Sequence, residues 1–237
     1  MEPSRRFVLV VAALVLLAAA APAGATFHFM QIEQVQGGFC GMSSAQAIQL
    51  RMRAAGQSLT SGTVLIARDA AGNNPVTLIT TPGNVSNGAA GSRILFATPD
   101  WVAAAGGPTP DFILSNPIPQ TSLDAGKLTF GISTTAYWSL AWGGANYTGT
   151  NTGALDNDAD GNFSPPFPGV LPHLGDDAAR FTGTAGAMST NNAADYALST
   201  SPATFTNNAG SSSALNVCVF NDGFESGDTT GWTAVAP

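Results

Sequence analysis

Charged residues are scarce in this chain: Asp, Glu, Lys and Arg together make up only 10% of its 237 residues. The 8 basic residues are outnumbered by 15 acidic ones, which gives a formal net charge of −7. Proteins that bind the phosphate backbone of a nucleic acid need clustered cations. Beyond residue 25, Arg51 and Arg53 are the only close basic pair. The composition therefore argues against nucleic acid as a partner.

Histidine is almost absent, since His28 and His173 are the only two. Neither lies in a metal-binding spacing such as His-Glu-x-x-His, and the chain has no Gly-x-Ser-x-Gly nucleophile motif. A dispersed pair of carboxylates for glycoside cleavage stays open, because separation along the sequence does not set separation in space. The sequence therefore favours a non-catalytic protein over an enzyme. A secreted hydrolase is the third hypothesis.

Long apolar runs are also missing, with one exception at residues 7–21. Arg5 and Arg6 precede this run, and the small residues 23–25 follow it. This order predicts a helical secretory signal peptide at residues 1–25. The alternative is a membrane anchor, but the run is shorter than the roughly 20 residues that a spanning helix needs. We expect a secreted, periplasmic or cell-surface protein with no transmembrane span after signal cleavage.

The chain has only two cysteines, Cys40 and Cys218. An even number of cysteines in an exported chain predicts a disulfide. For so large a loop, chain entropy predicts a stabilisation of about 5 kcal/mol. The alternative is a pair of buried free thiols. The absence of a Cys-x-x-Cys spacing makes the predicted bridge structural.

Short apolar segments separated by Gly, Asn, Asp and Pro dominate the rest of the chain. At residues 45–53 the composition favours a helix, but Ile48, Leu50 and Met52 alternate with polar residues. Alternation is the stronger signal and predicts a strand. Strands are predicted at residues 27–35, 45–53, 63–68, 76–80, 92–98, 127–132, 136–142, 179–182, 196–198 and 215–220.

This pattern predicts an all-β, immunoglobulin-like antiparallel β-sandwich as a single domain over residues 26–220. Residues 143–177 form a Gly/Asn/Pro-rich loop that is either functional or partly disordered. Residues 221–237 form a C-terminal tail.

The order of four segments carries a family resemblance: residues 26–33 (TFHFMQIE), 47–51 (AIQLR), 62–69 and 91–97 (GSRILFA). It resembles the first half of lamin-tail-type immunoglobulin-like domains in secreted bacterial proteins. More closely, the chain is similar to a group of exported bacterial proteins of unassigned function, over about residues 26–182. The resemblance implies a binding or scaffolding module without catalytic residues.

One loop has the spacing of a calcium ligand set. Asp156, Asp158 and Asp160 alternate and are followed by Gly161 and Asn162, as in the first half of an EF-hand loop. Phe167 stands where the final Glu would be, and two prolines precede it, so an EF-hand is excluded. A calcium loop completed by Asp176 or Asp177 competes with an ordinary turn.

Aromatic residues gather just before this loop, at Trp138, Trp142 and Tyr147. If exposed, they would stack on sugar rings and form a ligand-binding site. The competing interpretation is a hydrophobic core, in which such side chains provide large buried area.

Near the C-terminus, residues 222–232 (DGFESGDTTGW) resemble the opening of secreted bacterial jelly-roll modules. This FESGD-type motif is interpreted either as an edge strand or as a sorting tag.

The leading hypothesis is a secreted non-catalytic module for adhesion, scaffolding or cell-envelope association. The alternative is a calcium-assisted carbohydrate-binding module. The expected partner is an extracellular protein or a polysaccharide.

Overall fold

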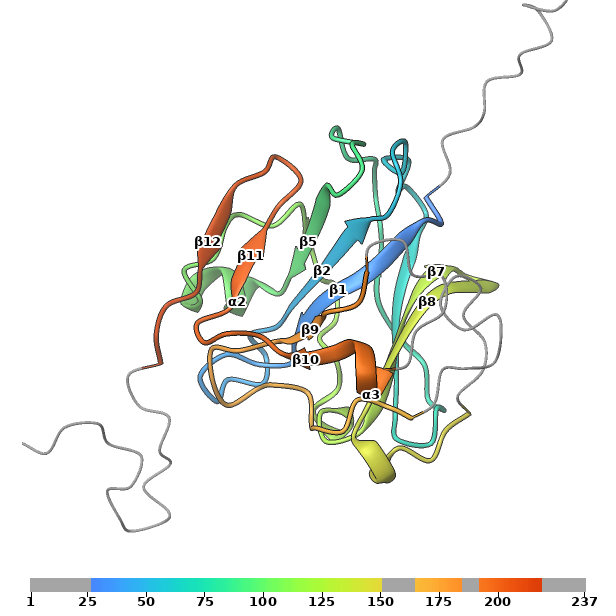
Figure 1. The fold of residues 1–237 in the computed structure, drawn as a ribbon, viewed down its shortest axis with the longest axis vertical. Coiled ribbons are helices and arrows are strands. Elements are labelled where there is room, and N and C mark those ends of the chain that lie inside the picture. The colour runs from blue at the N-terminus through green and yellow to red at the C-terminus, as the bar shows by residue number, and fades with distance from the viewer. Residues whose placement is uncertain (1–26, 151–164, 185–191, 219–237) are drawn as a thin grey trace, which may run out of the picture.

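Figure 1 shows a computed structural model of the protein, which describes residues 27–150, 165–184 and 192–218. Strands dominate the described part. They are β1 (Met30–Gln36), β2 (Ala47–Met52), β3 (Val64–Arg68), β4 (Val76–Thr80), β5 (Arg93–Ala97), β6 (Phe112–Ile113), β7 (Gly126–Ile132), β8 (Thr135–Trp142), β9 (Ala179–Phe181), β10 (Tyr196–Leu198), β11 (Thr204–Thr206) and β12 (Ser212–Ala214). The helices are α2 (Pro99–Ala104), α3 (Asn192–Asp195) and the 3-10 turns η1 (Gln120–Ser122) and η2 (Gly144–Asn146).

The strands form two larger sheets and a separate hairpin. One sheet has the order β10-β9-β1-β2-β5-β6, the second has the order β4-β3-β7-β8, and β11 pairs with β12. Neighbouring strands are antiparallel, except that β5 and β6 are parallel. The predicted all-β class is therefore confirmed. The contested segment at residues 45–53 contains a strand, β2, between β1 and β5.

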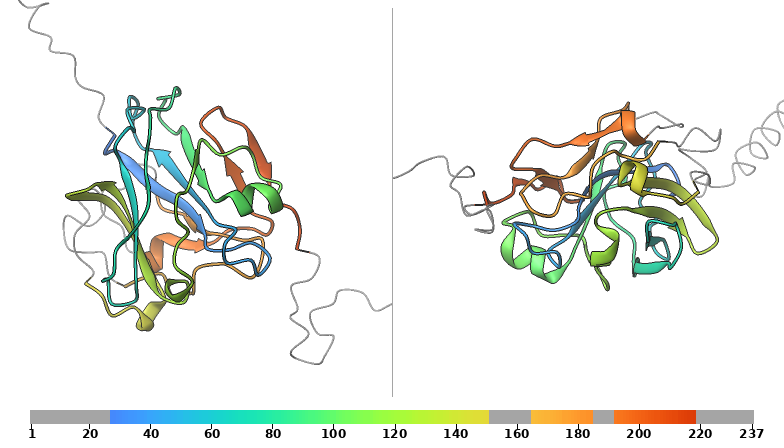
Figure 2. Two further views of the ribbon diagram at one scale, coloured as in Figure 1. Left: turned by 180° about the vertical axis from the view of Figure 1, so that it is seen from behind. Right: turned by 90° about the horizontal axis from the view of Figure 1, so that it is seen from below.

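Apolar side chains from both sheets meet in one hydrophobic cluster. Ile32 and Leu50 belong to the six-stranded sheet, while Leu128, Trp138 and Leu140 belong to the four-stranded sheet. All five are buried and occupy alternate strand positions, as period-two patterning requires. Figure 2 shows the two sheets beside each other from two further directions. The immunoglobulin-like arrangement stays a prediction.

A β-bulge in β1 keeps its apolar residues on the core side. Ile32 lies opposite Leu50, and Gln34 lies opposite Gln49, so Glu33 is an extra residue between them. With two residues opposite one, the apolar position shifts by one along the strand. Val35 therefore faces the core with Ile32, although the two are an odd number of residues apart.

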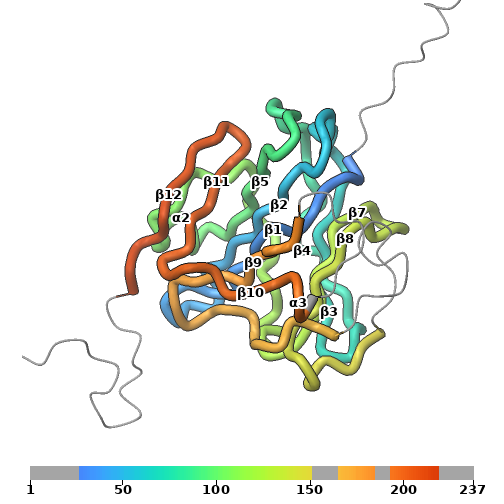
Figure 3. The backbone as a smooth tube through the Cα atoms, viewed as in Figure 1, coloured from blue at the N-terminus to red at the C-terminus, as the bar shows by residue number. Residues whose placement is uncertain are grey.

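The other face of the six-stranded sheet is also covered. Trp101 of α2, Phe205 of β11 and Leu215 pack on Leu95 and Ala97 of β5 in a second hydrophobic cluster. Figure 3 shows the β11–β12 hairpin running alongside β5, although the two segments are far apart in the sequence. We call residues 199–218 the covering segment.

The prediction of the last strand is wrong in part. Residues 215–218 do not form a strand, and the strand of this region is β12, just before them. The amide of Leu215 donates to the carbonyl of Ala203, and that of Asn216 donates to the carbonyl of Ala105 at the end of α2. The two carbonyl acceptors belong to different segments of the chain, so residues 215–218 do not pair with one continuous strand. Cys218 therefore follows the last described strand instead of lying within it.

Several predicted features lie outside the described residues: the signal peptide at 1–25, the tail at 221–237, and the end of the predicted strand at 219–220. In the ranges that the structure does describe, no helix has the length and apolar character to cross a membrane.

A buried tyrosine connects the two sheets. Nε1 of Trp138, on β8, donates to the hydroxyl oxygen of Tyr196 on β10 over 2.9 Å. The Tyr196 hydroxyl donates in turn to the carbonyl oxygen of Ile32 on β1 over 2.6 Å. Burial raises the pKa of Tyr196 far above its usual value, so the hydroxyl stays protonated and keeps this donor.

The Tyr196→Phe variant tests this connection. Removing the hydroxyl leaves a buried indole N–H and a buried carbonyl without their partner, which costs about 1–3 kcal/mol. We expect the free energy of unfolding in guanidinium chloride to fall by that amount. Tyr137→Phe is the matched control, because Tyr137 is only half-buried. Equal effects of the two variants would contradict the role given to Tyr196.

Candidate functional site

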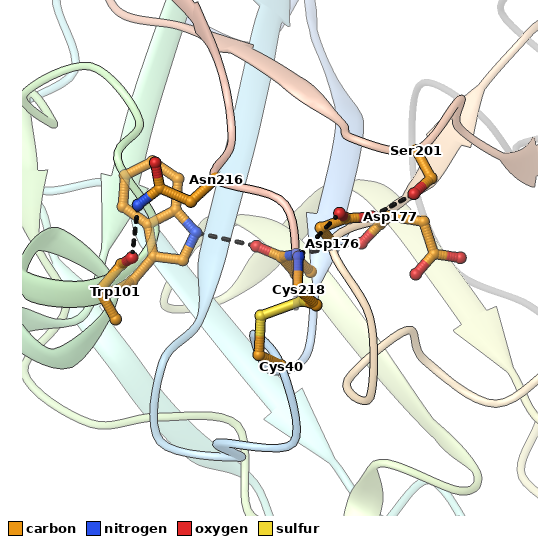
Figure 4. Close-up of a disulfide and its surroundings, with 9 residues drawn as sticks. Cys40, Trp101, Asp176, Asp177, Ser201, Asn216 and Cys218 are labelled. Carbon is orange, nitrogen blue, oxygen red and sulfur yellow. Dashed lines mark hydrogen bonds between the residues drawn. A yellow bond between two sulfur atoms is a disulfide. The ribbon is translucent and has the colours of Figure 1, made fainter. Parts of the chain in front are cut away.

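The two cysteines form a disulfide that closes the fold. The Cα atoms of Cys40 and Cys218 are 5.5 Å apart, and their Sγ atoms are bonded. Cys40 lies in the connection between β1 and β2, whereas Cys218 ends the covering segment (Figure 4). The predicted pairing is confirmed. The bridge therefore holds the end of the covering segment against the first connection of the sheet.

A buried carboxylate supports the disulfide from one side (Figure 4). Asp176 is 5% exposed. Its Oδ1 accepts a hydrogen bond from the Ser201 hydroxyl, and its Oδ2 accepts one from the backbone amide of Cys218 over 3.3 Å. On the other side, the amide of Cys40 donates to the carbonyl of Gly175 over 3.0 Å. Residues 175–176 are thus fixed to both halves of the bridge.

A groove with a cavity volume of about 450 Å³ lies next to this point. Its lining is mostly apolar and comes from residues 167–177, the end of β10 and Ser201. The lining residues are Phe167, Gly169, Val170, Pro172, His173, Leu174, Gly175, Asp176, Asp177, Leu198 and Ser201. Val170, Leu174 and Leu198 are 47%, 60% and 58% exposed. Exposed apolar side chains gathered around one hollow are characteristic of a binding surface.

Close packing of a glycine positions one wall of the groove. A Cβ atom on Gly38 would lie 2.9 Å from both Cβ and the carbonyl oxygen of His173. Only glycine lets the β1–β2 connection approach this wall so closely. Nδ1 of His173 is 2.8 Å from the carbonyl oxygen of Leu171. One ring nitrogen of His173 is therefore used within the wall.

The groove has one available carboxylate at its rim. Asp177 is half-buried, and the Nε2 of Gln36 donates to its backbone carbonyl over 3.1 Å. This hydrogen bond fixes the backbone, while the side-chain carboxylate has no hydrogen bond or ion pair within the described part of the chain. Asp177 can therefore pair with a cationic group that enters the groove.

The predicted calcium ligands Asp156, Asp158, Asp160 and Asn162 lie outside the described residues. Within the ranges that are described, no three His, Cys, Asp or Glu side chains come close enough to hold a metal ion. The calcium site remains a prediction from the sequence.

The structure places the predicted sugar-binding aromatics in the interior. Trp138 and Trp142 are 0% exposed and Tyr147 is 6% exposed. The two indoles lie on the face of β8 that packs into the main core, and Nε1 of Trp142 donates to the carbonyl of Ser122 over 2.8 Å. Burial raises the pKa of Tyr147 to about 12. Because packed side chains cover these rings, their faces are not open for sugar stacking.

A polar row that was not predicted from the sequence lies on the outer face of the six-stranded sheet. Gln31, Arg51 and Arg93 lie directly opposite one another on β1, β2 and β5. We call these three residues the arginine row. Arg53 is not part of it, since its guanidinium lies over the rings of Phe29 and Trp138. The only sequence signal for the row is a polar residue at the matching alternate position of three strands.

Glu33, the residue inserted by the bulge, neutralises one end of the row. Its carboxylate forms a two-point ion pair with Arg93, with Nε–Oε2 and Nη2–Oε1 distances of 2.7 and 3.0 Å. Gln49 also donates to Oε2 over 2.7 Å. The Nη1 of Arg51 stays 4.0 Å from Oε1, which is too far for a hydrogen bond. Arg93 therefore holds Glu33 through two hydrogen bonds, whereas Arg51 forms only a longer ion pair with it.

Comparisons with known proteins leave the family open. No family model matches the chain, and no curated protein matches it. The resemblance to lamin-tail-type domains stays a prediction from the sequence.

The disulfide can be tested by replacing both cysteines with serine. The bridge closes a loop with a sequence separation of 178, so its loss should lower the free energy of unfolding by up to about 5 kcal/mol. Denaturation in guanidinium chloride measures this change. Wild-type protein in a reducing agent should match the double variant. Identical unfolding midpoints for oxidised and reduced wild type would exclude a stabilising bridge.

Proposed function

We propose that this chain is an exported, non-catalytic binding module with an immunoglobulin-like β-sandwich fold, which serves adhesion, scaffolding or cell-envelope association. The observation that carries the proposal is the apolar groove beside the Cys40–Cys218 disulfide. Disulfides persist in oxidising, extracytoplasmic compartments, and this agrees with the signal peptide predicted at residues 1–25.

The chemistry of the groove favours a protein segment as its occupant. Leu174 and Leu198 offer apolar surface that a partner side chain would remove from water. Asp177 offers a carboxylate at the rim. An apolar residue next to a Lys or Arg matches both features. The net charge of −7 also attracts a basic segment over a longer range.

The groove is also held in shape before anything binds. The disulfide and Asp176 fix its inner wall, and the amide of Gly41 donates to the carbonyl of His173. A pre-formed site loses less conformational entropy when a partner binds. This rigidity supports a binding role for residues 167–177.

A peptide-display selection on the immobilised mature protein tests the proposal. We expect selected peptides to share a large apolar residue next to Lys or Arg. Their affinity should fall at least tenfold in Leu174→Ser, because the apolar contact is lost. It should also fall in Asp177→Asn, and the wild-type affinity should weaken as salt rises. Fluorescence anisotropy measures each dissociation constant.

Leu59→Ser is the matched control, since Leu59 is 44% exposed and does not line the groove. Its peptide affinity should equal that of the wild type. If the selected peptides bind Leu174→Ser as tightly as wild type, the groove is not the binding site.

A further inference from the structure

The described chain ends beside the groove. The backbone amide of Cys218, the last described residue, donates to Oδ2 of Asp176 over 3.3 Å, and Asp176 lines the groove. Figure 4 shows Cys218 beside Asp176, which also accepts a hydrogen bond from Ser201 in the groove lining. The disulfide holds the Cα atom of Cys218 5.5 Å from that of Cys40. The bridge therefore fixes the point next to the groove from which the following residues leave the fold.

The residues that follow Cys218 begin with apolar side chains. Val219, Phe220 and Phe224 are three of the first six. Because a chain spans at most about 3.6 Å per residue, Phe220 stays within about 7 Å of Cys218 and Phe224 within about 22 Å. Both aromatic residues are therefore within reach of the groove lining next to Asp176.

The groove offers matching surface to these side chains. Val170, Leu174 and Leu198 line it and are 47%, 60% and 58% exposed. A phenyl ring buried against them would remove apolar area on both sides from water. The cavity volume of about 450 Å³ also falls within the range of ligand-binding sites.

The attachment at Cys218 strengthens a contact that is weak on its own. Binding of the next residues is intramolecular, with an effective concentration on the order of millimolar for a short flexible connection. A segment whose dissociation constant as a free peptide is also about millimolar would fill the groove in about half of the molecules. A second copy of the chain reaches that occupancy only in millimolar solutions. The observations therefore favour the chain's own residues as the occupant.

Charge limits this contact and favours a basic partner over it. Residues 219–237 include Asp222, Glu225 and Asp228 but no Lys or Arg. They cannot pair with the carboxylate of Asp177 at the rim, and their acids repel it. A segment with an apolar residue next to a Lys or Arg satisfies both the apolar lining and Asp177.

We propose that residues 219–224 occupy the groove of their own chain and that a basic, apolar protein segment displaces them. This regulation rests on the function proposed above for the groove. The affinity measured for a partner is then reduced in proportion to the fraction of grooves that are open. Since Asp177 attracts the partner and repels residues 219–224, rising salt weakens the first contact and strengthens the second.

Methyl NMR on the full chain in its exported form tests the contact directly. The Phe220→Ser/Phe224→Ser double variant removes both phenyl rings. We expect the methyl resonances of Leu174 and Leu198 to shift in this variant, because they lose the ring currents. The methyl resonances of Leu59, which does not line the groove, should stay unchanged.

Trp232→Ser is the matched control, because it removes an aromatic ring that lies beyond residues 219–224 in the sequence. It should leave the Leu174 and Leu198 resonances unchanged. Unshifted resonances in the double variant would overturn the contact. Shifts that develop only as wild-type protein is concentrated would overturn it in favour of a second copy of the chain.

The affinity of a selected peptide with an apolar residue next to Lys or Arg tests the regulation. By fluorescence anisotropy, the double variant should bind it at least about twofold more tightly than wild type, and Trp232→Ser should bind it equally. Asp177→Asn should weaken the peptide, yet enlarge the methyl shifts caused by residues 219–224, because the repulsion is removed. Equal peptide affinity in wild type and double variant would overturn the regulation and leave the groove as a peptide site. A failed selection would overturn the groove function and the displacement together, whereas the methyl shifts decide the contact on their own.

Discussion

The need to pair the buried glutamines of β1 and β2 shapes the outer half of the molecule. Every residue of β1 is buried, although its outer face is polar. Nε2 of Gln34 donates to the carbonyl of Thr204, and Oε1 of Gln49 accepts from the amide of Thr206. Buried amides without such partners would be costly. The glutamines therefore determine where the covering segment lies, because apolar packing alone has little directional preference.

The groove depends on the same interactions. Gln36 accepts a hydrogen bond from Nε1 of Trp101 and donates to the carbonyl of Asp177. One side chain thus joins β1 to α2 and to the groove wall. The disulfide then holds the end of the covering segment next to Asp176. The inner wall of the groove is therefore attached to the sheet through Gln36 and the disulfide. These contacts hold a wall without regular secondary structure in one conformation.

Alternating apolar residues allowed much of the first half of the fold to be predicted. The strands β2, β3, β4, β7 and β8 and the disulfide all follow from local pattern or from cysteine count. Polar alternation predicts a solvent-exposed face, whereas the glutamine face is covered by a segment that lies 157 residues after Gln49 at the contact of Gln49 with Thr206. The Glu33–Arg93 pair spans 60 residues and depends on the bulge. Pairings at this range are decided by tertiary packing, which local pattern does not report.

The groove and the arginine row are held at a fixed spacing by one strand. Gln36 contacts the backbone of Asp177 at the groove, and Gln31 belongs to the row at the other end of β1. At about 3.4 Å per residue, these two positions are roughly 17 Å apart. The groove presents an acid, whereas the row presents a base. Every residue of the strand between them is buried, and the strand pairs with β2 along its length, so the sheet fixes their separation.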